Sequence, residues 1–375
     1  MEKEFRDYFL GLSPLKQAGF FLWPSLGGTE LSKNEIHLLE EIKPSGLIFF
    51  KRNFTSMDQA SSLITQIKMR VENKKEAFFK PLILSIDEEG GRVSRLPVEG
   101  IRGKSALEFA ESGDKLGLKA QVQRQCNAAK EIGLNCLLAP VADTLTEEKN
   151  TVLGDRCFGR TVDSVVEYAS LVHQTISENA LWSCAKHFPG HGNTLGDSHK
   201  EFATSNTSLN QLKSREWMPF RSLITQNIPF IMAAHVLLPF IDPKNPATLS
   251  EIILTKQLRG DLGFEGLVLS DDLRMNAIAL HYDVNKEQES SITEDAGTSK
   301  SSTTANDSYL KLASIEALNA GCDILLSCQS IEREMIIAQS IAEKMEQDKA
   351  FQEKMVQKAW RVYGVLSGWF RPTPE

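Results

Sequence analysis

The sequence predicts a (β/α)8 barrel, also called a TIM barrel. Short apolar runs rich in Ile, Leu, Val and Phe recur along the chain, and each is long enough for one strand buried on both faces of a parallel sheet. Amphipathic segments separate them, and eight such alternations favour a closed barrel. The runs are GFFLW (19–23), GLIFF (46–50), LILSID (82–87), NCLLAP (135–140), WSCAKH (182–187), PFIMAAH (229–235), GLVLSD (266–271) and CDILLSC (322–328).

The segments between the runs carry the spacing of helices. In residues 56–72 and 163–180, apolar side chains recur at i, i+3 and i+4, which places them on one helical face. An open, doubly wound sheet of eight strands is the alternative architecture. Neither a G-x-G-x-x-G nor a P-loop string follows the first run, so the usual reason for that architecture is missing.

Length and composition fit one intracellular domain. The 375 residues suit a single barrel domain over 1–375, and a net charge of -7 without a basic run disfavours nucleic acid as a partner. The N-terminal segment is acidic where a signal peptide is basic, and no stretch approaches the roughly 20 apolar residues of a membrane span. We therefore expect a cytoplasmic monomer without membrane contact. The cysteines form no C-x-x-C pair and are expected to be reduced; they are Cys126, Cys136, Cys157, Cys184, Cys322 and Cys328.

Residues 284–307 break the alternation. This polar, Ser/Thr-rich stretch cannot bury enough apolar surface to offset the entropy of ordering, so we expect a mobile insertion there. It follows the seventh run and therefore falls on the rim where barrel enzymes have their active sites. A surface insertion is favoured over a lid.

Polar residues follow five of the predicted strands. The carboxyl ends of all strands of a barrel meet at one rim, so side chains far apart in sequence are brought together there. The residues in question are Asp87, Asp143, Lys186, His187, His235, Asp271 and Asp272. Each alone is as easily a loop or capping residue, but the set indicates an active site.

The densest of these segments is KHFPGHGNTLGDSH (186–199). Asp197 and His199 are two residues apart and project to the same side of an extended backbone. A carboxylate beside an imidazole fixes its tautomer and raises its pKa, which suits a general acid near neutral pH. His187 and His191 also suggest a metal, but Pro189 and the glycines disfavour the helix that H-x-x-x-H zinc ligation needs, so we expect no metal.

Two further segments supply carboxylates and arginines. In GFEGLVLSDDLRM (263–275), Asp271 ends the seventh predicted strand, where it could attack an anomeric carbon while an imidazole protonates the leaving oxygen. In SIDEEGGRVSRL (85–96), Asp87 is a candidate anchor for sugar hydroxyls. Arginines can bind a hydroxyl or a carboxylate by a fork, and the candidates are Arg92, Arg95 and Arg156.

These motifs resemble the β-N-acetylglucosaminidases of glycoside hydrolase family 3 from GLIFFKRNF (46–54) to ALNAGCDILLSC (317–328). KHFPGHGNT followed by DSH is the most specific part. The resemblance implies a retaining enzyme without a cofactor that removes terminal β-linked GlcNAc from GlcNAc-1,6-anhydroMurNAc muropeptides in cell-wall recycling. It implies Asp271 as nucleophile, His199 as acid/base and Asp197 as its partner. It places the sugar contacts at Asp87, Arg95, Arg156, Lys186 and His187.

The sequence also departs from that family. Glu88 stands where glutamine is usual, which we expect to add a charge beside the sugar anchor Asp87; Asn193 replaces an acid, and 284–307 is longer than the usual connection. These departures leave the aglycone preference open. A broader exo-β-glycosidase and a phosphorylase remain alternatives at the same site, since a histidine acid/base carries no negative charge to repel phosphate. The third alternative is a non-catalytic carbohydrate-binding barrel, in which Asp271 or His199 would be lost.

Overall fold

Eight parallel strands form one sheet that closes on itself. The computed structural model describes residues 1–72, 77–78, 80–194, 203–275, 277–282, 308–328 and 331–369. The strand order is β1-β11-β10-β7-β5-β4-β3-β2, and a parallel bridge between Ser25 and Ile48 joins the two ends. The strands are β1 (Leu22–Pro24), β2 (Gly46–Phe49), β3 (Ile83–Ile86), β4 (Cys136–Leu137), β5 (Trp182–Phe188), β7 (Phe230–Ala233), β10 (Leu267–Asp272) and β11 (Ile324–Ser327). The predicted barrel is confirmed, and closure excludes the open sheet.

All eight apolar runs contain a strand, but the first run also contains the end of a helix. Helix α2 covers Pro14–Gly19, and β1 begins only at Leu22. An apolar run does not by itself separate a buried helix end from a buried strand. Gly19, the last residue of α2, packs so closely on the end of α3 that a Cβ there would lie 1.8 Å from the carbonyl oxygen of Ile42.

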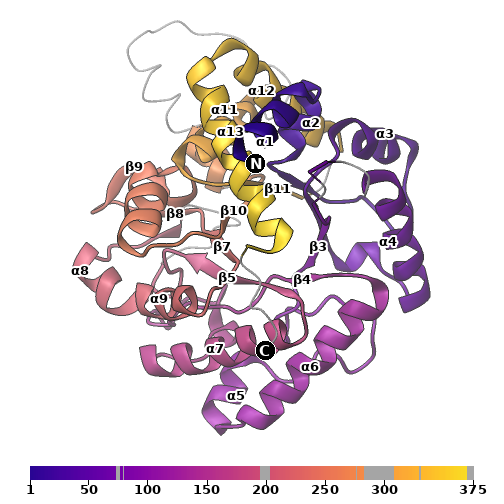
Figure 1. Ribbon diagram of the computed structural model, residues 1–375. Helices are drawn as coiled ribbons and strands as arrows, with labels where there is room; N and C mark the ends of the chain where they lie inside the picture. The colour runs from indigo at the N-terminus through magenta and orange to yellow at the C-terminus, as the bar shows by residue number, and fades with distance from the viewer. Residues whose placement is uncertain are drawn as a thin grey trace, which may run out of the picture.

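Helices surround the barrel (Figure 1). The remaining helices are α1 (Glu2–Gly11), α3 (Lys33–Ile42), α4 (Met57–Val71), α5 (Ala106–Ser112), α6 (Lys115–Ile132), α7 (Val162–Glu178), α8 (Leu209–Gln211), α9 (Trp217–Thr225), α11 (Ser308–Ala320), α12 (Ile331–Gln347) and α13 (Lys349–Gly364). Short 3-10 helices are η1 (Lys51–Asn53), η2 (Gly154–Arg156) and η4 (Ala247–Leu249), and π-helices are η3 (Leu212–Glu216), η5 (Ile252–Asp261) and η6 (Val365–Trp369).

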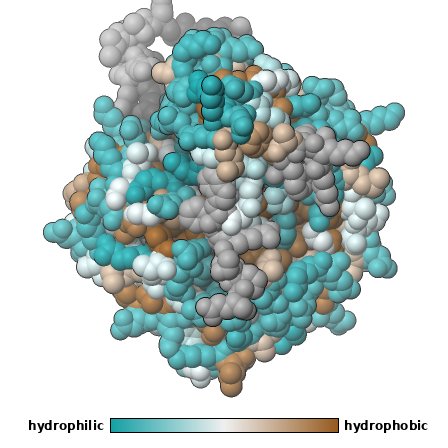
Figure 2. Space-filling model, in the orientation of Figure 1, coloured by the Kyte–Doolittle hydropathy of each residue, from teal (hydrophilic) through white to brown (hydrophobic). Residues whose placement is uncertain are grey.

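The two helices expected from their spacing, 56–72 and 163–180, are α4 and α7. Both begin where a hydroxyl caps the first turn: Ser56 Oγ accepts from the Gln59 N–H at 3.2 Å, and Thr161 Oγ1 does the same for Ser164 at 3.4 Å. Hydrophilic side chains predominate on the face in Figure 2, where hydrophobic surface is broken into small patches. The apolar sides of such amphipathic helices therefore face the barrel.

A second, small sheet that the sequence did not predict stands at the carboxyl rim. It consists of β6 (Ala203–Thr204), β8 (Val236–Leu238) and β9 (Asp242–Pro246), in the order β6-β8-β9. Strand β8 begins three residues after β7 ends, so the sheet follows directly from the barrel. Its position beside β7 and β10 is visible in Figure 1.

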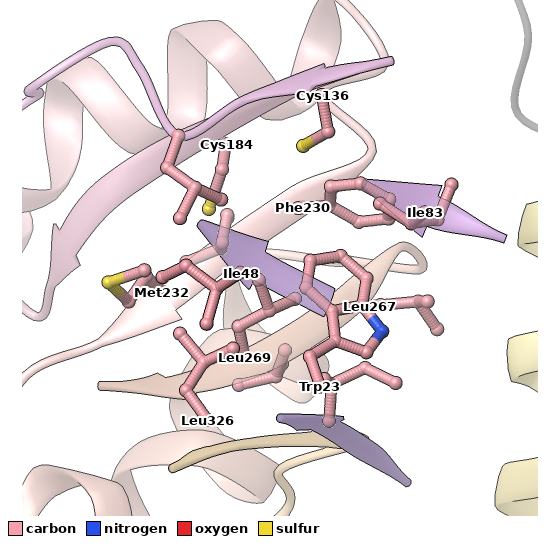
Figure 3. Packing of buried hydrophobic residues seen from close by; sticks show 14 of the residues in the cluster. Trp23, Ile48, Ile83, Cys136, Cys184, Phe230, Met232, Leu267, Leu269 and Leu326 are labelled. Atoms are coloured by element: carbon pink, nitrogen blue, oxygen red, sulfur yellow. The ribbon is translucent and has the colours of Figure 1, made fainter. Parts of the chain in front are cut away.

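Apolar side chains fill the interior of the barrel (Figure 3). The rings of Trp23 and Phe230 meet edge to face with centroids 5.5 Å apart, and Trp182 stacks on Phe230 at 5.4 Å. The buried indole of Trp23 donates to Ser45 Oγ at 2.9 Å, so its polar atom is satisfied. This packed core closes the barrel from below and leaves the carboxyl rim for polar chemistry.

The N-terminal helix lies against the last long helix. Phe5 of α1 is fully buried and stacks on Tyr363 of α13 with centroids 5.2 Å apart, while Arg6 Nη1 lies 2.6 Å from Glu353 Oε1. On these contacts we propose that 1–375 is one domain; the expected insertion at 284–307 lies outside the described residues. None of the helices in the described ranges combines the length and apolarity needed to cross a membrane.

Candidate active site

A cavity of about 750 Å³ opens at the carboxyl ends of the strands. Three of its apolar lining residues are Ile48, Met232 and Leu326, which Figure 3 shows together at one end of the barrel filling. Its other lining residues are Phe50, Arg52, Asp87, Glu89, Arg92, Val93, Arg95, Thr151, Val152, Arg156, Lys186, His187, Asp271, Asp272, Met275 and Cys328. The volume is within the range of ordinary ligand sites.

Six of the eight predicted site residues line this one cavity: Asp87, Arg95, Arg156, Lys186, His187 and Asp271. They come from the ends of β3, β5 and β10 and from the loops after β3 and β4. The remaining two, Asp197 and His199, lie outside the described residues.

Asp271, near the end of β10, is held as a carboxylate. Burial opposes ionisation, but the imidazole of His235 and the N–H of Asp272, which donates to Asp271 Oδ1 at 2.8 Å, lower the pKa of Asp271 below its ordinary value. A carboxylate that is ionised and reaches the cavity has the properties of a nucleophile.

The neighbouring carboxyl group has the opposite tendency. Burial, together with the charge of Asp271, raises the pKa of Asp272 to about 6, although the N–H groups of Arg274 and Cys328 donate to Asp272 Oδ1 at 3.1 and 3.2 Å. The environment therefore separates two adjacent carboxyl groups, one ionised throughout the neutral range and one that titrates near its lower edge.

A buried ion network forms the opposite wall. Lys186 Nζ lies 2.6 Å from both Asp87 Oδ1 and Glu89 Oε1. The Arg156 guanidinium binds Glu89 by two bonds of 2.8 Å, from Nε to Oε2 and from Nη2 to Oε1. Burial opposes the charge of Glu89, but these two cations hold the pKa of Glu89 well below its ordinary value. Glu89 is the site residue that the sequence analysis missed.

Glu88 does not stand beside the sugar anchor, so that expectation was wrong. Its side chain is turned under the loop, where Oε1 accepts from Ser94 Oγ at 2.6 Å and Oε2 accepts from the N–H of Arg95 at 2.7 Å. Gln125 Nε2 also donates to Oε1, at 3.0 Å. Side chains alternate along an extended segment, so Asp87 and Glu89 face the cavity together and Glu88 faces away.

His187 is fixed as a neutral ring. Its Nδ1 lies 2.7 Å from Asp143 Oδ2, and its Nε2 lies 3.3 Å from Arg156 Nη2. An arginine only donates, so Nε2 must accept and the proton is on Nδ1. Asp143 is fully buried and also accepts the N–H of His187 at 3.0 Å and of His191 at 2.6 Å. His187 can therefore bind a substrate but has no proton on Nε2 to donate.

His191 is neutral as well. Burial lowers the pKa of His191 to about 4. Its Nδ1 lies 2.7 Å from Thr194 Oγ1. His191 is thus not prepared to donate a proton near neutral pH.

The arginines of the cavity differ in how their charge is compensated. Arg92 Nε lies 2.7 Å from Asp155 Oδ1, and its Nη2 donates to the carbonyl of Val152 at 2.6 Å. Arg52 and Arg95 instead lie against the Phe50 ring, with Cζ at 4.4 and 5.9 Å from its centroid. Within the described residues neither of them forms an ion pair, and Arg95 Nε is buried without a hydrogen-bond acceptor.

An ionised carboxylate among hydrogen-bonding groups at a barrel rim suits nucleophilic catalysis, and comparison with known proteins gives the family of the chain. Residues 15–365 match the model of the glycosyl hydrolase family 3 N-terminal domain. The chain belongs to this family and is a glycoside hydrolase.

The most informative relatives have one activity in their names. A β-hexosaminidase of Idiomarina loihiensis is 33% identical over 307 residues, which is 81% of this chain and 82% of that protein. A family 3 β-N-acetylglucosaminidase from Paenibacillus sp. aligns with a TM-score of 0.80 at 27% identity over 97% of this chain; the match spans 65% of that longer protein. NagZ from Neisseria gonorrhoeae, in complex with N-trifluoroacetyl-D-glucosamine, aligns at 0.69 and 26% identity, covering 92% of this chain and 98% of that one.

Proposed function

We propose that the protein is a retaining exo-β-N-acetylglucosaminidase. In this proposal Asp271 is the nucleophile, His199 the general acid/base and Asp197 the group that orients His199. The observation that carries it is the ionised Asp271 carboxylate facing a closed wall of polar groups across a cavity of about 750 Å³. The chain is a glycoside hydrolase of the β-hexosaminidase type, consistent with its family and its curated relatives.

The reaction would proceed in two displacements. An oxygen of Asp271 attacks the anomeric carbon, the bond to the leaving oxygen breaks, and His199 gives its proton to that oxygen. Water then attacks the glycosyl-enzyme, His199 takes a proton from it, and Asp271 leaves as a carboxylate. The sugar leaves with the configuration it had in the substrate because each displacement inverts the anomeric carbon.

The wall opposite Asp271 would hold the sugar. Asp87 can accept hydroxyl protons, and Lys186 and Arg156 can donate to hydroxyl oxygens while Glu89 keeps both cations in place. His187, with Nε2 on the cavity side and its proton fixed on Nδ1, can take part only as an acceptor there. Nε2 of His187 faces the Arg156 donor, and burial lowers the pKa of His191 to about 4, which supports a proton donor elsewhere in the 186–199 segment and favours His199.

The proposed substrate is GlcNAc-1,6-anhydroMurNAc from muropeptides. Its aglycone carries carboxylates, and the cavity has two guanidinium groups, Arg52 and Arg95, without an acidic partner in the described residues. A cytoplasmic location goes with that recycling reaction, and the six cysteines are free and buried. We propose the monomer as the active unit.

The nucleophile is tested with an aryl β-GlcNAc. Asp271→Ala should abolish turnover, whereas appreciable residual activity would exclude Asp271 as nucleophile. Asp272→Ala, at the neighbouring carboxyl group, is the matched control and should keep measurable activity. Proton NMR of the first turnovers should show the β-anomer of GlcNAc; the α-anomer would refute retention.

The acid is tested with leaving groups of different basicity. His199→Ala should cost about 10²–10⁴-fold on poor leaving groups and much less on activated aryl groups, which need little protonation. An equal loss on both would contradict the acid role. Asp197→Asn should reproduce part of the same pattern, since Asp197 acts through His199.

The substrate and the reaction type are tested together. GlcNAc-anhydroMurNAc-peptide should have a higher kcat/KM than chitobiose, and Arg52→Ala and Arg95→Ala should narrow that difference. Equal kcat/KM values would favour a broader exo-β-glycosidase. Arg52 and Arg95 would also suit inorganic phosphate. Formation of a glycosyl phosphate in phosphate buffer would therefore identify the enzyme as a phosphorylase and refute hydrolysis as its reaction.

A further inference from the structure

His235 contacts the backbone of Asp272, the residue next to the proposed nucleophile. It follows β7 at the rim, and its side chain is buried with 1% of its surface exposed. In the register of the barrel, Ala233 of β7 pairs with Ser270 of β10, so His235 comes level with Asp272 two residues further along both strands. The sequence analysis noted His235 at the rim, but the proposed mechanism leaves it without a role.

Both ring nitrogens of His235 face oxygen atoms. Nε2 lies 2.9 Å from the backbone oxygen of Asp272, which can only accept, so Nε2 carries a proton. Nδ1 lies 2.8 Å from Thr248 Oγ1. The state of the ring therefore depends on where the single hydroxyl proton of Thr248 goes.

The surroundings of Thr248 decide this point. Thr248 is fully buried in η4, and its Oγ1 lies 2.8 Å from the carbonyl oxygen of Ala234 and 3.2 Å from that of Ala233. Two oxygens 2.8 Å apart need a proton between them, so the hydroxyl donates to a carbonyl. Thr248 Oγ1 then accepts from Nδ1, and the ring of His235 carries a proton on each nitrogen.

We propose that His235 is a positioning residue for Asp271, resting on the proposed role of Asp271 as nucleophile. As an imidazolium between Thr248 and the carbonyl of Asp272, it fixes the end of β10 and places a positive charge beside the nucleophilic carboxylate. The same charge is the largest of the influences that lower the pKa of Asp271 against the effect of burial. His235 has no contact with the substrate in this role.

Substitutions at Thr248 distinguish the effect of the His235 charge from the effect of its hydrogen bond to the Asp272 carbonyl. Thr248→Val has nearly the same shape but removes the acceptor for Nδ1, so the ring should become neutral and still donate from Nε2 to Asp272. Thr248→Ser keeps the hydroxyl and serves as the matched control. Measurement of Tm for both variants separates loss of folding from loss of the charge.

The protonation state of His235 is measured by NMR, independently of enzymatic activity. In protein with ¹⁵N-labelled histidine at neutral pH, the His235 signal, assigned by its absence in His235→Gln, should show a proton on both ring nitrogens in the wild type and in Thr248→Ser. In Thr248→Val it should show one. A wild-type ring with one bare nitrogen would overturn the proposal.

The positioning role is read from kinetics. On an aryl β-GlcNAc, Thr248→Val should lower kcat about 10-fold with little change in KM, because a charge near Asp271 shifts its ionisation and orientation, and Thr248→Ser should restore kcat. Equal kcat for the Val and Ser variants, or a loss confined to KM, would overturn the positioning role. A wild type that does not cleave the substrate would instead refute the proposed function, while the NMR signal would still report the state of His235.

Discussion

Glu89→Gln is the sharpest test of the sugar-binding wall. The substitution keeps the shape of the side chain and removes the charge that compensates Arg156 and Lys186. Lys186 keeps Asp87 at 2.6 Å, but Arg156 keeps only a carbonyl at 3.4 Å and a ring nitrogen of His187 at 3.3 Å. The substitution therefore leaves one guanidinium, 14% exposed, without an anion.

The expected cost follows from that orphaned charge. Removal of one partner from a buried ion pair costs about 3–5 kcal/mol. With an unfolding entropy of about 2.1 cal/mol/K per residue over this chain, the Tm should fall by about 4–6 °C. Both Lys186 and Arg156 lose their fixed geometry, so kcat/KM for an aryl β-GlcNAc should fall as well.

Calorimetry compares Glu89→Gln with Glu167→Gln. Glu167 also pairs with a lysine, Lys115, but both side chains are about half exposed, so water screens the pair and its loss should hardly change Tm. If the two variants melt at the same temperature, Glu89 is not a buried counter-charge and the account of the wall is wrong.

Three further outcomes follow from other parts of the structure. Asp323 is fully buried at the base of the barrel and pairs with three cations, Arg259, Lys358 and Arg361. Asp323→Asn should therefore lower the free energy of unfolding, measured by urea denaturation, by about 3–5 kcal/mol, and a loss below about 1 kcal/mol would contradict this role of Asp323. The raised pKa of Asp272, about 6, means that Asp272 takes up a proton in the folded state before it does in the unfolded chain. Its contribution to stability therefore increases as the pH falls from about 6 towards 4, and Asp272→Asn should remove this increase from Tm measured against pH. Glu88→Gln should leave KM nearly unchanged, because the Ser94 hydroxyl can accept instead of donate and the Gln125 amide can turn over. Glu88→Ala should raise KM, because the loop that carries Arg95 loses its hydrogen-bond acceptor. Equal KM values for the two variants would refute this account.

The barrel was predictable because its strands are buried on both faces. Each then appears as an uninterrupted apolar run, and the spacing of the runs leaves room for a helix between them. The small sheet at the rim gives no such signal. Strand β6 has two residues, and β9 reads DPKNP, a sequence whose prolines and asparagine indicate a turn. Its strands depend on pairing with β8, which is a tertiary effect.

The site residues at strand ends were predictable, because the carboxyl ends of all strands of a barrel meet at one rim. Asp87, Lys186 and Asp271 stand at strand ends, and this arrangement brings them together whatever their separation in sequence. Glu89 was missed although the alternation of side chains along an extended segment would have placed it beside Asp87. The neutral tautomer of His187 could not be predicted, because it depends on contacts with Asp143 and Arg156 from other loops.

The wall of the cavity has consequences for the response of the enzyme to salt. Asp87 and Glu89 balance Lys186 and Arg156 within a few ångströms, so these four groups together present almost no net field to an approaching ligand. An uncharged glycoside should therefore bind with a KM that hardly changes with ionic strength. Arg52 and Arg95 form no ion pair with any residue that the structure describes, so the KM of an acidic glycoside should rise as salt is added. Higher ionic strength would then favour cleavage of uncharged glycosides over acidic ones.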